Sequence, residues 1–367
     1  MVIFPPCHSS EAGVIYRFSR RPGLNAEERT MRKQGAAVGL RDIAEMTGVS
    51  LTTVSKILGG KDKLFADATV ARIRQAAQQL NYRPNAIARN LRCGRTRTVG
   101  AMIPLIGYFS HVLSGIHSTL FEHGYAVIIG TPPKLNTASD DQTEAQVIHQ
   151  LIERNVDGII LRPSSEQFER AYFDEIWQRN VPLIAIDREL SLFKTDFVGT
   201  DDEAIGAAAA RHLADLGHRR LLFIGRDDVQ TAELRGLGFR CAAGEVEGAS
   251  CAHFVGAGQW QEVASVMQRD DRPTGIFCYS DAVAERLITR LQEWGVRVPE
   301  DVSVIGAGNT KMVRELTTFD QQPYEIGKGA AQLYLKRINE DTRAASPTII
   351  RLPAILIPRA TTAPPPA

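Results

Sequence analysis

Apolar residues recur at helical spacing near the start of the chain and predict two short helices around a turn. The residues expected to face inward are Leu40, Ile43, Ala44, Val54, Ile57 and Leu58. Gly48, Val49 and Ser50 lie between the two helices and favour a tight turn. The hydroxyl of Ser50 can accept from free N–H groups of the second helix, so Ser50 is expected to cap it. This pattern is typical of a helix-turn-helix.

The polar side of the second predicted helix carries side chains suited to DNA. Short hydroxyls, one cation and an apolar tip make up this set: Ser50, Leu51, Thr52, Thr53, Ser55 and Lys56. Such groups can reach base edges and phosphates when the N-terminus of a helix enters the major groove. The alternative is an ordinary polar helix face in contact with water.

Two more helices are predicted before residue 92. The first starts near Asp67, which we expect to cap it, and its inward residues are Val70, Ile73, Ala77 and Leu80. The second runs from Asn85 to Leu91 and has no apolar partner within this stretch. A helix of fewer than about two turns is not stable alone in water. We therefore expect it to fold against DNA and a second copy of itself.

From Thr98 onward the pattern changes to short apolar runs that alternate with helical patterns. The runs span residues 99–103, 126–129, 158–161, 183–186, 221–224, 275–278 and 302–305. This alternation predicts an α/β fold with parallel sheets covered by helices. Seven such strands are too many for one small sheet.

Charge is divided unevenly along the 367-residue chain, although its net charge is only +1. Residues 31–97 hold 13 Lys or Arg against 4 Asp or Glu, while residues 98–367 hold 26 against 35. A basic head on an acidic body suits a head that contacts phosphate. Residues 1–37 are expected to be a disordered N-terminal extension. Residues 1–30 are expected to be an extension or a misassigned start, and a basic DNA-contacting arm is the alternative.

Several functional classes lack support. The five cysteines, at positions 7, 93, 241, 251 and 278, contain no C-x-x-C pair and fit a reducing cytosol. No apolar run has the length of a membrane span or a secretory segment, so we expect a cytoplasmic, nucleoid-associated protein without a membrane partner. The sequence has no catalytic motif and no histidine cluster. We therefore expect no enzyme activity, metal or cofactor.

The motifs of the head resemble those of the lactose-repressor (LacI/GalR-type) family of bacterial transcriptional regulators. They are Asp42-Ile43-Ala44, Gly48-Val49-Ser50, Thr53-Val54-Ser55-Lys56, Leu80-Asn81-Tyr82, Pro84-Asn85, Ala88 and Leu91. The resemblance implies DNA contacts by a hinge helix that includes Asn85, Arg89 and Leu91, with Leu91 as a minor-groove wedge. The sequence departs from the family pattern at Gly59 and Ala66, which puts fine specificity in doubt.

The resemblance continues over the body and implies two doubly wound lobes like those of periplasmic sugar-binding proteins. The expected divisions are a helix-turn-helix domain at 38–83, a hinge helix and linker at 84–97, and an effector-binding and dimerisation core at 98–359. One lobe is expected to comprise 98–195 plus 319–345, and the other 196–318 plus 346–359. Residues 360–367 are expected to be a disordered tail. They lack the leucine heptads of a tetramerising helix, so a tetramer is not expected.

Ligands of open α/β sheets lie beyond the carboxyl ends of the strands, and the residues there are the candidate effector contacts. By resemblance they are Tyr108, Phe109, Arg188, Arg235, Trp260, Ser280, Asp281 and Asn309. Arg235 is the strongest candidate, because a guanidinium grips effector oxygens with fixed donors. A surface salt bridge is the alternative for Arg235, and packing is the alternative for the three aromatic residues.

The resemblance implies a homodimeric repressor of a carbohydrate-utilisation operon that binds a near-palindromic operator and a small-molecule effector. The expected effector is a sugar or sugar derivative. Ser280 replaces an amide, and Gly308 stands where the family has a carboxylate. These two departures make a sugar acid or sugar phosphate more plausible. The alternatives are a purine-type regulator and a sugar-binding transport protein without DNA function.

Overall fold

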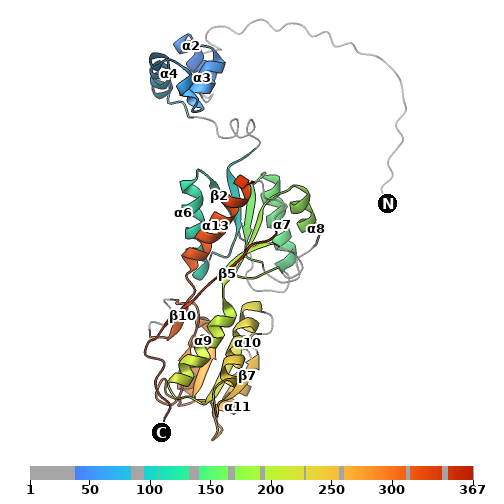
Figure 1. Cartoon of the computed structure of the whole chain (residues 1–367), viewed down its shortest axis with the longest axis vertical. Coiled ribbons are helices and arrows are strands. Elements are labelled where there is room, and N and C mark those ends of the chain that lie inside the picture. The colour runs from blue at the N-terminus through green and yellow to red at the C-terminus, as the bar shows by residue number, and fades with distance from the viewer. Residues whose placement is uncertain are drawn as a thin grey trace, which may run out of the picture. The chain divides into compact units, whose positions relative to one another are not determined.

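The computed structural model describes residues 38–83, 95–105, 107–131, 140–163, 170–190, 195–226, 229–255, 260–310, 315–340 and 346–366. The chain divides into two compact units, a head that ends at Arg89 and a core from Asn90 onward. Each unit is described by itself, and Figure 1 labels the elements of both.

The head is a small bundle of helices around one apolar cluster. Its elements are α2 (Leu40–Thr47), α3 (Leu51–Leu58), η1 (Asp62–Leu64) and α4 (Asp67–Gln79). The buried residues are Ile43, Val54, Ile57, Val70, Ile73 and Ala76. Gly48 ends α2 with a left-handed φ of 65°, which glycine adopts without strain. The helix-turn-helix predicted from the apolar spacing is confirmed.

The two predicted helix caps in the head have different outcomes. The Ser50 hydroxyl accepts from the Thr53 backbone N–H at 3.2 Å, so Ser50 caps α3 as expected. The prediction for Asp67 is wrong by one position. Ala66 occupies the cap of α4 without a side-chain bond, and Asp67 is the first helical residue. A carboxylate in the first turn is still favourable beside the free N–H groups.

The first lobe of the core is built on a six-stranded parallel sheet in the order β11-β5-β4-β3-β1-β2. The strands are β1 (Thr98–Met102), β2 (Ala126–Gly130), β3 (Gly158–Leu161), β4 (Leu183–Ile186), β5 (Asp196–Thr200) and β11 (Ile349–Leu352). Helices α6 (Tyr108–Glu122) and α13 (Pro323–Glu340) pack on one face, and α7 (Asp140–Glu153) and α8 (Arg170–Gln178) on the other (Figure 1). A separate apolar cluster fills each face.

The second lobe repeats this plan with a four-stranded parallel sheet in the order β7-β6-β8-β9. The strands are β6 (Arg220–Gly225), β7 (Ser250–Val255), β8 (Gly275–Cys278) and β9 (Ser303–Ile305). Helices α9 (Asp202–Asp215) and α10 (Gln230–Gly244) cover one face. Helices α11 (Trp260–Met267) and α12 (Asp281–Glu293) cover the other. The predicted α/β fold with two lobes is confirmed.

The boundaries between the lobes lie later in the chain than the sequence indicated. Strands β5 and β11 were expected in the second lobe, but they pair with β4 and with each other in the first sheet. The chain enters the second lobe only at α9. The chain returns to the first lobe after β10 (Thr318–Asp320), and it leaves the first sheet again after β11. Strand β12 (Ile355–Ile357) then pairs antiparallel with β10. Backbone pairing, rather than the apolar runs, sets these boundaries.

The end of the chain is ordered in the structure, so the prediction of a disordered tail is wrong for residues 360–366. Thr361 is 7% exposed, and its carbonyl accepts from the Val304 N–H at 2.8 Å. The carbonyl of Ala363 accepts from Ser303 Oγ at 2.9 Å. The edge strand β9 therefore has a backbone partner in the tail, which an apolar period does not reveal.

Candidate DNA-binding surface and effector site

The exposed face of α3 carries the described part of the predicted DNA-binding set. Leu51, Thr52 and Lys56 are exposed, and Leu51 retains 41% of its accessible surface. Positions 51, 52, 55 and 56 lie on one side of the helix, while Val54 and Ile57 face the core of the head. An exposed leucine beside a cation and a hydroxyl can meet a thymine methyl, a phosphate and a base edge.

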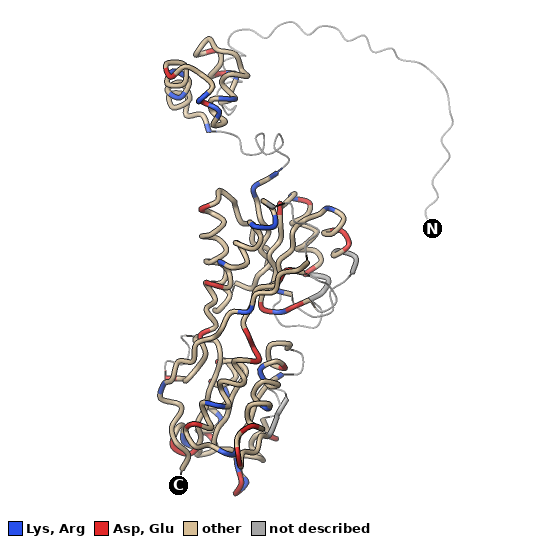
Figure 2. The backbone as a smooth tube through the Cα atoms, viewed as in Figure 1, with Lys and Arg blue, Asp and Glu red and all other residues tan. Residues whose placement is uncertain are grey.

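Two hydroxyls of the predicted set are occupied by each other. Ser50 Oγ and Thr53 Oγ1 lie 2.9 Å apart, and Ser50 Oγ also receives the Thr53 N–H. These two residues therefore shape the start of α3, whereas Thr52 is exposed. Figure 2 shows that cationic and anionic positions are both present on the head. Asn85, Arg89 and Leu91 lie outside the described residues.

Arg235, predicted as the strongest effector contact, is the centre of a buried polar network in the core. It lies on α10 and is only 4% exposed. Its Nε donates to Asp202 Oδ1 at 2.7 Å, its Nη1 to the Tyr279 carbonyl at 2.5 Å and its Nη2 to Gln321 Oε1 at 2.8 Å. Three of its five N–H groups are thus engaged by described residues. The alternative of a surface salt bridge is wrong, because Arg235 and Asp202 are both buried.

Asp202 is the charged partner of Arg235, and it begins α9. Burial raises the pKa of Asp202 from 3.8 to about 6, although the neighbouring Arg235 guanidinium opposes this shift. The effect of burial on the pKa is the larger of the two, because a carboxylate that is 6% exposed loses most of its hydration. The pair is therefore held together at a cost in desolvation, which is common at sites that exchange bonds with a ligand.

Tyr108 approaches the same network from α6 in the first lobe. Burial raises the pKa of its phenol, the Asp187 carboxylate adds to the rise, and a hydrogen bond with Thr200 together with the charge of Arg235 opposes it. Thr200 Oγ1 in turn donates to Gln321 Oε1 at 3.4 Å. The structure thus brings together Tyr108 and Arg235, which are 127 positions apart in the sequence.

An ion pair and two aromatic rings extend this network in the first lobe. Arg162 Nε donates to Asp187 Oδ2 at 3.0 Å, and the Arg162 guanidinium lies 5.4 Å from the centre of the Phe109 ring. The rings of Tyr108 and Phe109 meet edge to face at 5.1 Å. We refer to the whole network as the Arg235 cluster, which consists of Tyr108, Phe109, Arg162, Asp187, Thr200, Asp202, Arg235 and Gln321.

Five members of the Arg235 cluster were not singled out from the sequence: Arg162, Asp187, Thr200, Asp202 and Gln321. Arg162 follows β3, Asp187 follows β4 and Thr200 ends β5. These three residues can therefore be found from the sequence by examining the carboxyl end of every strand, where ligands of open α/β sheets bind. Asp202 and Gln321 join through contacts with Arg235 that no local pattern predicts.

Three predicted effector contacts have structural roles in the second lobe. Both oxygens of Asp281 are engaged, with Oδ1 receiving Thr318 Oγ1 at 2.5 Å and Oδ2 receiving the Thr310 N–H at 2.7 Å. Asn309 is held by Asp320 at 3.1 Å and by Arg359 at 2.6 Å. Ser280 occupies the cap position of α12 without a side-chain cap bond.

The two remaining predicted contacts, Trp260 and Arg188, are positioned by different elements. The Trp260 ring packs on the second-lobe core with the Arg290 guanidinium 5.5 Å from its centre. Arg290 lies near the end of α12, about 14 Å along the helix from its first residue. Arg188 is buried next to Asp187, and its N–H donates to the Ile186 carbonyl at 2.7 Å. Arg188 therefore directly follows a member of the Arg235 cluster, Asp187, in the sequence. Trp260 lies near the later turns of α12.

The comparisons with known proteins account for both units. Residues 39–85 match the model of bacterial regulatory proteins of the lacI family, and residues 210–362 match a periplasmic binding protein-like domain. The HTH-type transcriptional repressor PurR of Vibrio vulnificus (strain CMCP6) is 32% identical over 315 residues, which cover 82% of this chain and 92% of the relative. The chain belongs to the LacI family of bacterial regulatory proteins.

Solved structures of the family share this fold. A lac repressor dimer bound to operator and the anti-inducer ONPF superposes with a TM-score of 0.74 at 24% identity, covering 89% of this chain and 100% of that one. A LacI family transcriptional regulator from Enterococcus faecium with bound ribose gives a TM-score of 0.59 at 28% identity, covering 73% and 99%. This LacI-family chain is thus a DNA-binding transcriptional repressor with a head for DNA and a core of the small-molecule-binding type.

No helix among the described residues combines the length and apolar character needed to cross a bilayer. Within the same ranges no three His, Cys, Asp or Glu side chains are grouped to hold a metal ion.

Proposed function

We propose that this repressor is a homodimer whose affinity for a near-palindromic operator is set by a polyhydroxylated effector, a sugar or sugar derivative, bound at the Arg235 cluster. The observation that carries the proposal is the arrangement around Arg235. Buried and half-buried donors and acceptors from both lobes converge there, beside the carboxyl ends of β3, β4 and β5. A ligand that exchanges bonds with this network changes the contacts between the lobes.

The chemistry of the cluster favours hydroxyl-rich ligands. Each sugar hydroxyl is both a donor and an acceptor, and the cluster offers guanidinium donors beside carboxylate, amide and hydroxyl acceptors. Asp187 and Asp202 are suited to accept from hydroxyls, while Arg235 and Arg162 are suited to donate. A sugar acid or sugar phosphate also fits the two guanidinium groups, but each of these groups already pairs with a carboxylate.

The aromatic residues offer limited stacking surface to a planar base. Stacking on a base needs an open ring face. One face of Phe109 is near Arg162, and one face of Trp260 is near Arg290. A purine-type effector is still the second candidate, because curated relatives at 30–32% identity carry the name PurR. The relatives with bound ribose and cellobiose are further from this chain in sequence, at 28% and 22% identity.

The effector class is tested by measuring binding and its consequence separately. The full chain is titrated by calorimetry with ribose, cellobiose, their sugar acids and phosphates, and purine bases. Each compound that binds is then added to a gel shift with a duplex that the protein itself selects in vitro. We expect a sugar or sugar derivative to bind and to change the fraction of shifted duplex. A purine that alone does both would contradict the sugar proposal and support the second candidate.

Two matched variants locate the site. Tyr108→Phe removes one hydroxyl from the Arg235 cluster and keeps the ring, so effector affinity should fall by about 10-fold. Tyr125→Phe makes the same change on a ring that packs against Tyr334 in the first lobe, so it should leave the affinity unchanged. Equal affinities for both variants would show that the effector binds elsewhere.

The oligomeric state is tested with the same material. Two recognition helices must meet two half-sites of a near-palindrome, so we expect a dimer. Light scattering at micromolar concentration should report twice the 40.3 kDa mass of one chain. A monomer that still binds the selected duplex with full affinity would refute the dimer.

A further inference from the structure

Asp157 accepts hydrogen bonds from three donors on the segment through which the chain enters the core. This residue directly precedes β3, and the segment consists of Arg95, Thr96 and Arg97, directly before β1. Oδ1 of Asp157 receives the Thr96 N–H at 2.8 Å and Thr96 Oγ1 at 3.0 Å, and Oδ2 receives the Arg97 N–H at 2.7 Å. Bonds to an ionised acceptor are stronger than bonds between neutral groups.

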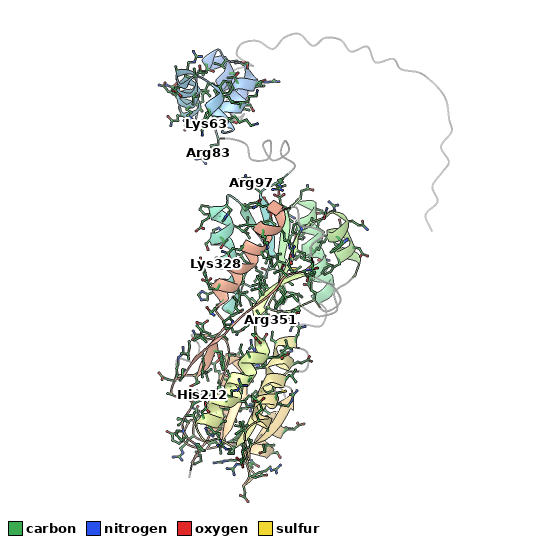
Figure 3. All side chains as sticks on the ribbon, in the orientation of Figure 1. Lys63, Arg83, Arg97, His212, Lys328 and Arg351 are labelled. Carbon is green, nitrogen blue, oxygen red and sulfur yellow. The ribbon has the colours of Figure 1, made fainter. Side chains whose placement is uncertain are left out.

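The backbone of Arg97 is in an uncommon conformation at this point. Its φ is 51°, in the left-handed region that residues with a side chain rarely adopt. Both sides of the residue are tied to the core, because its N–H binds Asp157 and its carbonyl accepts from the Ala126 N–H at 2.8 Å. The core thus holds a strained turn at the start of β1, where Figure 3 labels Arg97.

A third contact secures the same segment. Arg95 Nη2 donates to the Ile338 carbonyl at 2.9 Å, near the end of α13, where a cation is favourable beside the free carbonyl groups. The segment is therefore fastened to β3, to β2 and to the last turn of α13, although Arg95 and Arg97 are exposed. These contacts lie at the amino ends of β1 and β3, whereas the Arg235 cluster lies beyond carboxyl ends.

We infer that Asp157 is a positioning residue for DNA binding, because it holds the strained turn at Arg97 that sets the direction in which the chain leaves the core toward the head. This inference rests on the proposed function, in which two heads of a dimer must reach two half-sites together. A core that releases this turn lets each head sample more orientations, so the entropy lost on binding both half-sites rises. Operator affinity then falls although every DNA-contacting residue is intact.

The test compares two disruptions with two matched controls in the full chain. Asp157→Asn removes the carboxylate, and Asp174→Asn removes an exposed carboxylate of the same lobe on α8. Arg97→Pro fixes φ near −65° and removes the N–H donor. Arg97→Asn removes the same guanidinium, but asparagine tolerates the left-handed region. Each protein is titrated by fluorescence anisotropy against one duplex selected in vitro by the wild-type protein, with no effector present.

We expect Asp157→Asn and Arg97→Pro to weaken binding by about 10-fold, and Asp174→Asn and Arg97→Asn to stay within about 3-fold of the wild type. Thermal unfolding of all four variants is measured as a control. If all four unfold cooperatively, each core is folded, and a difference in affinity within a pair does not come from an unfolded core. Equal affinities within both pairs would overturn the inference. Because no effector is present, the outcome does not depend on which effector class the core binds.

Discussion

The exposed face of α3 and the Arg235 cluster are the two proposed recognition sites, and they differ in what their side chains do without a partner. On α3, Leu51, Thr52 and Lys56 project into solvent. In the cluster, Arg235 already binds three acceptors of its own chain, and its neighbour Asp202 is buried. DNA therefore adds contacts to α3, whereas an effector must exchange with contacts that already exist.

This difference predicts how each site responds to substitution. A side chain of α3 that projects into solvent contributes little to the stability of the head, so its loss should appear only when DNA is present. A member of the Arg235 cluster such as Arg235 or Asp202 bonds to other residues of the core, in addition to its proposed role in binding a ligand. Its loss should appear even in the absence of a ligand.

The largest effect is expected for Arg235→Ala. This change leaves the Asp202 carboxylate buried without its cation, so the free energy of unfolding of the core should fall by about 3–5 kcal/mol. Denaturant unfolding measures it. Arg211→Ala is the matched control on α9, because Arg211 is 62% exposed and 3.7 Å from an exposed Glu245, and its effect should be below about 1 kcal/mol.

A second substitution tests whether this loss of stability comes from the unpaired carboxylate or from lost packing. Most of the cost comes from the uncompensated carboxylate, so adding Asp202→Asn to Arg235→Ala should restore part of the stability. A double variant as unstable as the sum of the two single variants would mean that Arg235 stabilises the core through packing alone.

The next effect in size belongs to α3. Lys56→Ala removes one exposed cation that can contact a phosphate, so the log-log dependence of operator affinity on salt should lose about 0.9 of its slope. Thermal unfolding of the head should not change. Lys328→Ala, on α13 of the core, removes the same charge and should leave the salt dependence unchanged. A normal slope for Lys56→Ala would show that this side of α3 does not face the DNA backbone.

The same contrast decides what the sequence can predict. The head depends on local signals, and the Ser50 cap and the apolar faces of α2, α3 and α4 are read from spacing alone. The bounds of β3, β4 and β8 also match their apolar runs. Strands β5 and β7 were not predicted, because Asp196, Gly199, Ser250 and His253 interrupt their apolar residues.

The Arg235 cluster depends on contacts between distant residues. Asp202 and Gln321 lie 33 and 86 positions from Arg235, and neither belongs to a local pattern that marks a site. Asp281 and Asn309 show the opposite case. Their polar side chains follow strands, but Asp281 binds Thr310 and Thr318, and Asn309 binds Asp320 and Arg359. A polar residue at the end of a strand is predicted to lie near the other strand ends. Which group its side chain bonds to is decided by the whole fold.

A smaller effect is expected from the pH dependence of the Arg235 cluster. Burial raises the pKa of Asp202 in the folded core from 3.8 to about 6. The stabilisation that comes from protonating Asp202 is therefore fully present below pH 3.8 and is lost as the pH rises through about 6.

Between pH 7 and pH 5 this group should add about 1 kcal/mol to the free energy of unfolding of the core. Asp202→Asn removes the titrating group, so this gain should be missing from its profile. Urea unfolding of both proteins at each pH isolates the Asp202 contribution from that of other groups. Parallel profiles would show that Asp202 titrates at its ordinary pKa.

The smallest effect is expected from two neighbours with the same side chain, Thr52 and Thr53. Thr52 projects outward from α3, whereas Thr53 Oγ1 lies 2.9 Å from Ser50 Oγ at the helix cap. Thr52→Ala should reduce discrimination among duplexes that differ by single base pairs by about 3-fold, because only a base-facing hydroxyl distinguishes base edges. Thr53→Ala should instead lower the stability of the head by about 0.5 kcal/mol and change affinity for all duplexes alike. Anisotropy titrations over one set of single-base variants measure both changes. If Thr53→Ala altered the ranking of the duplexes more than Thr52→Ala did, the assignment of the base-reading side of α3 would be wrong. Thr53, which bonds to the cap residue Ser50, would then be the residue in contact with the bases.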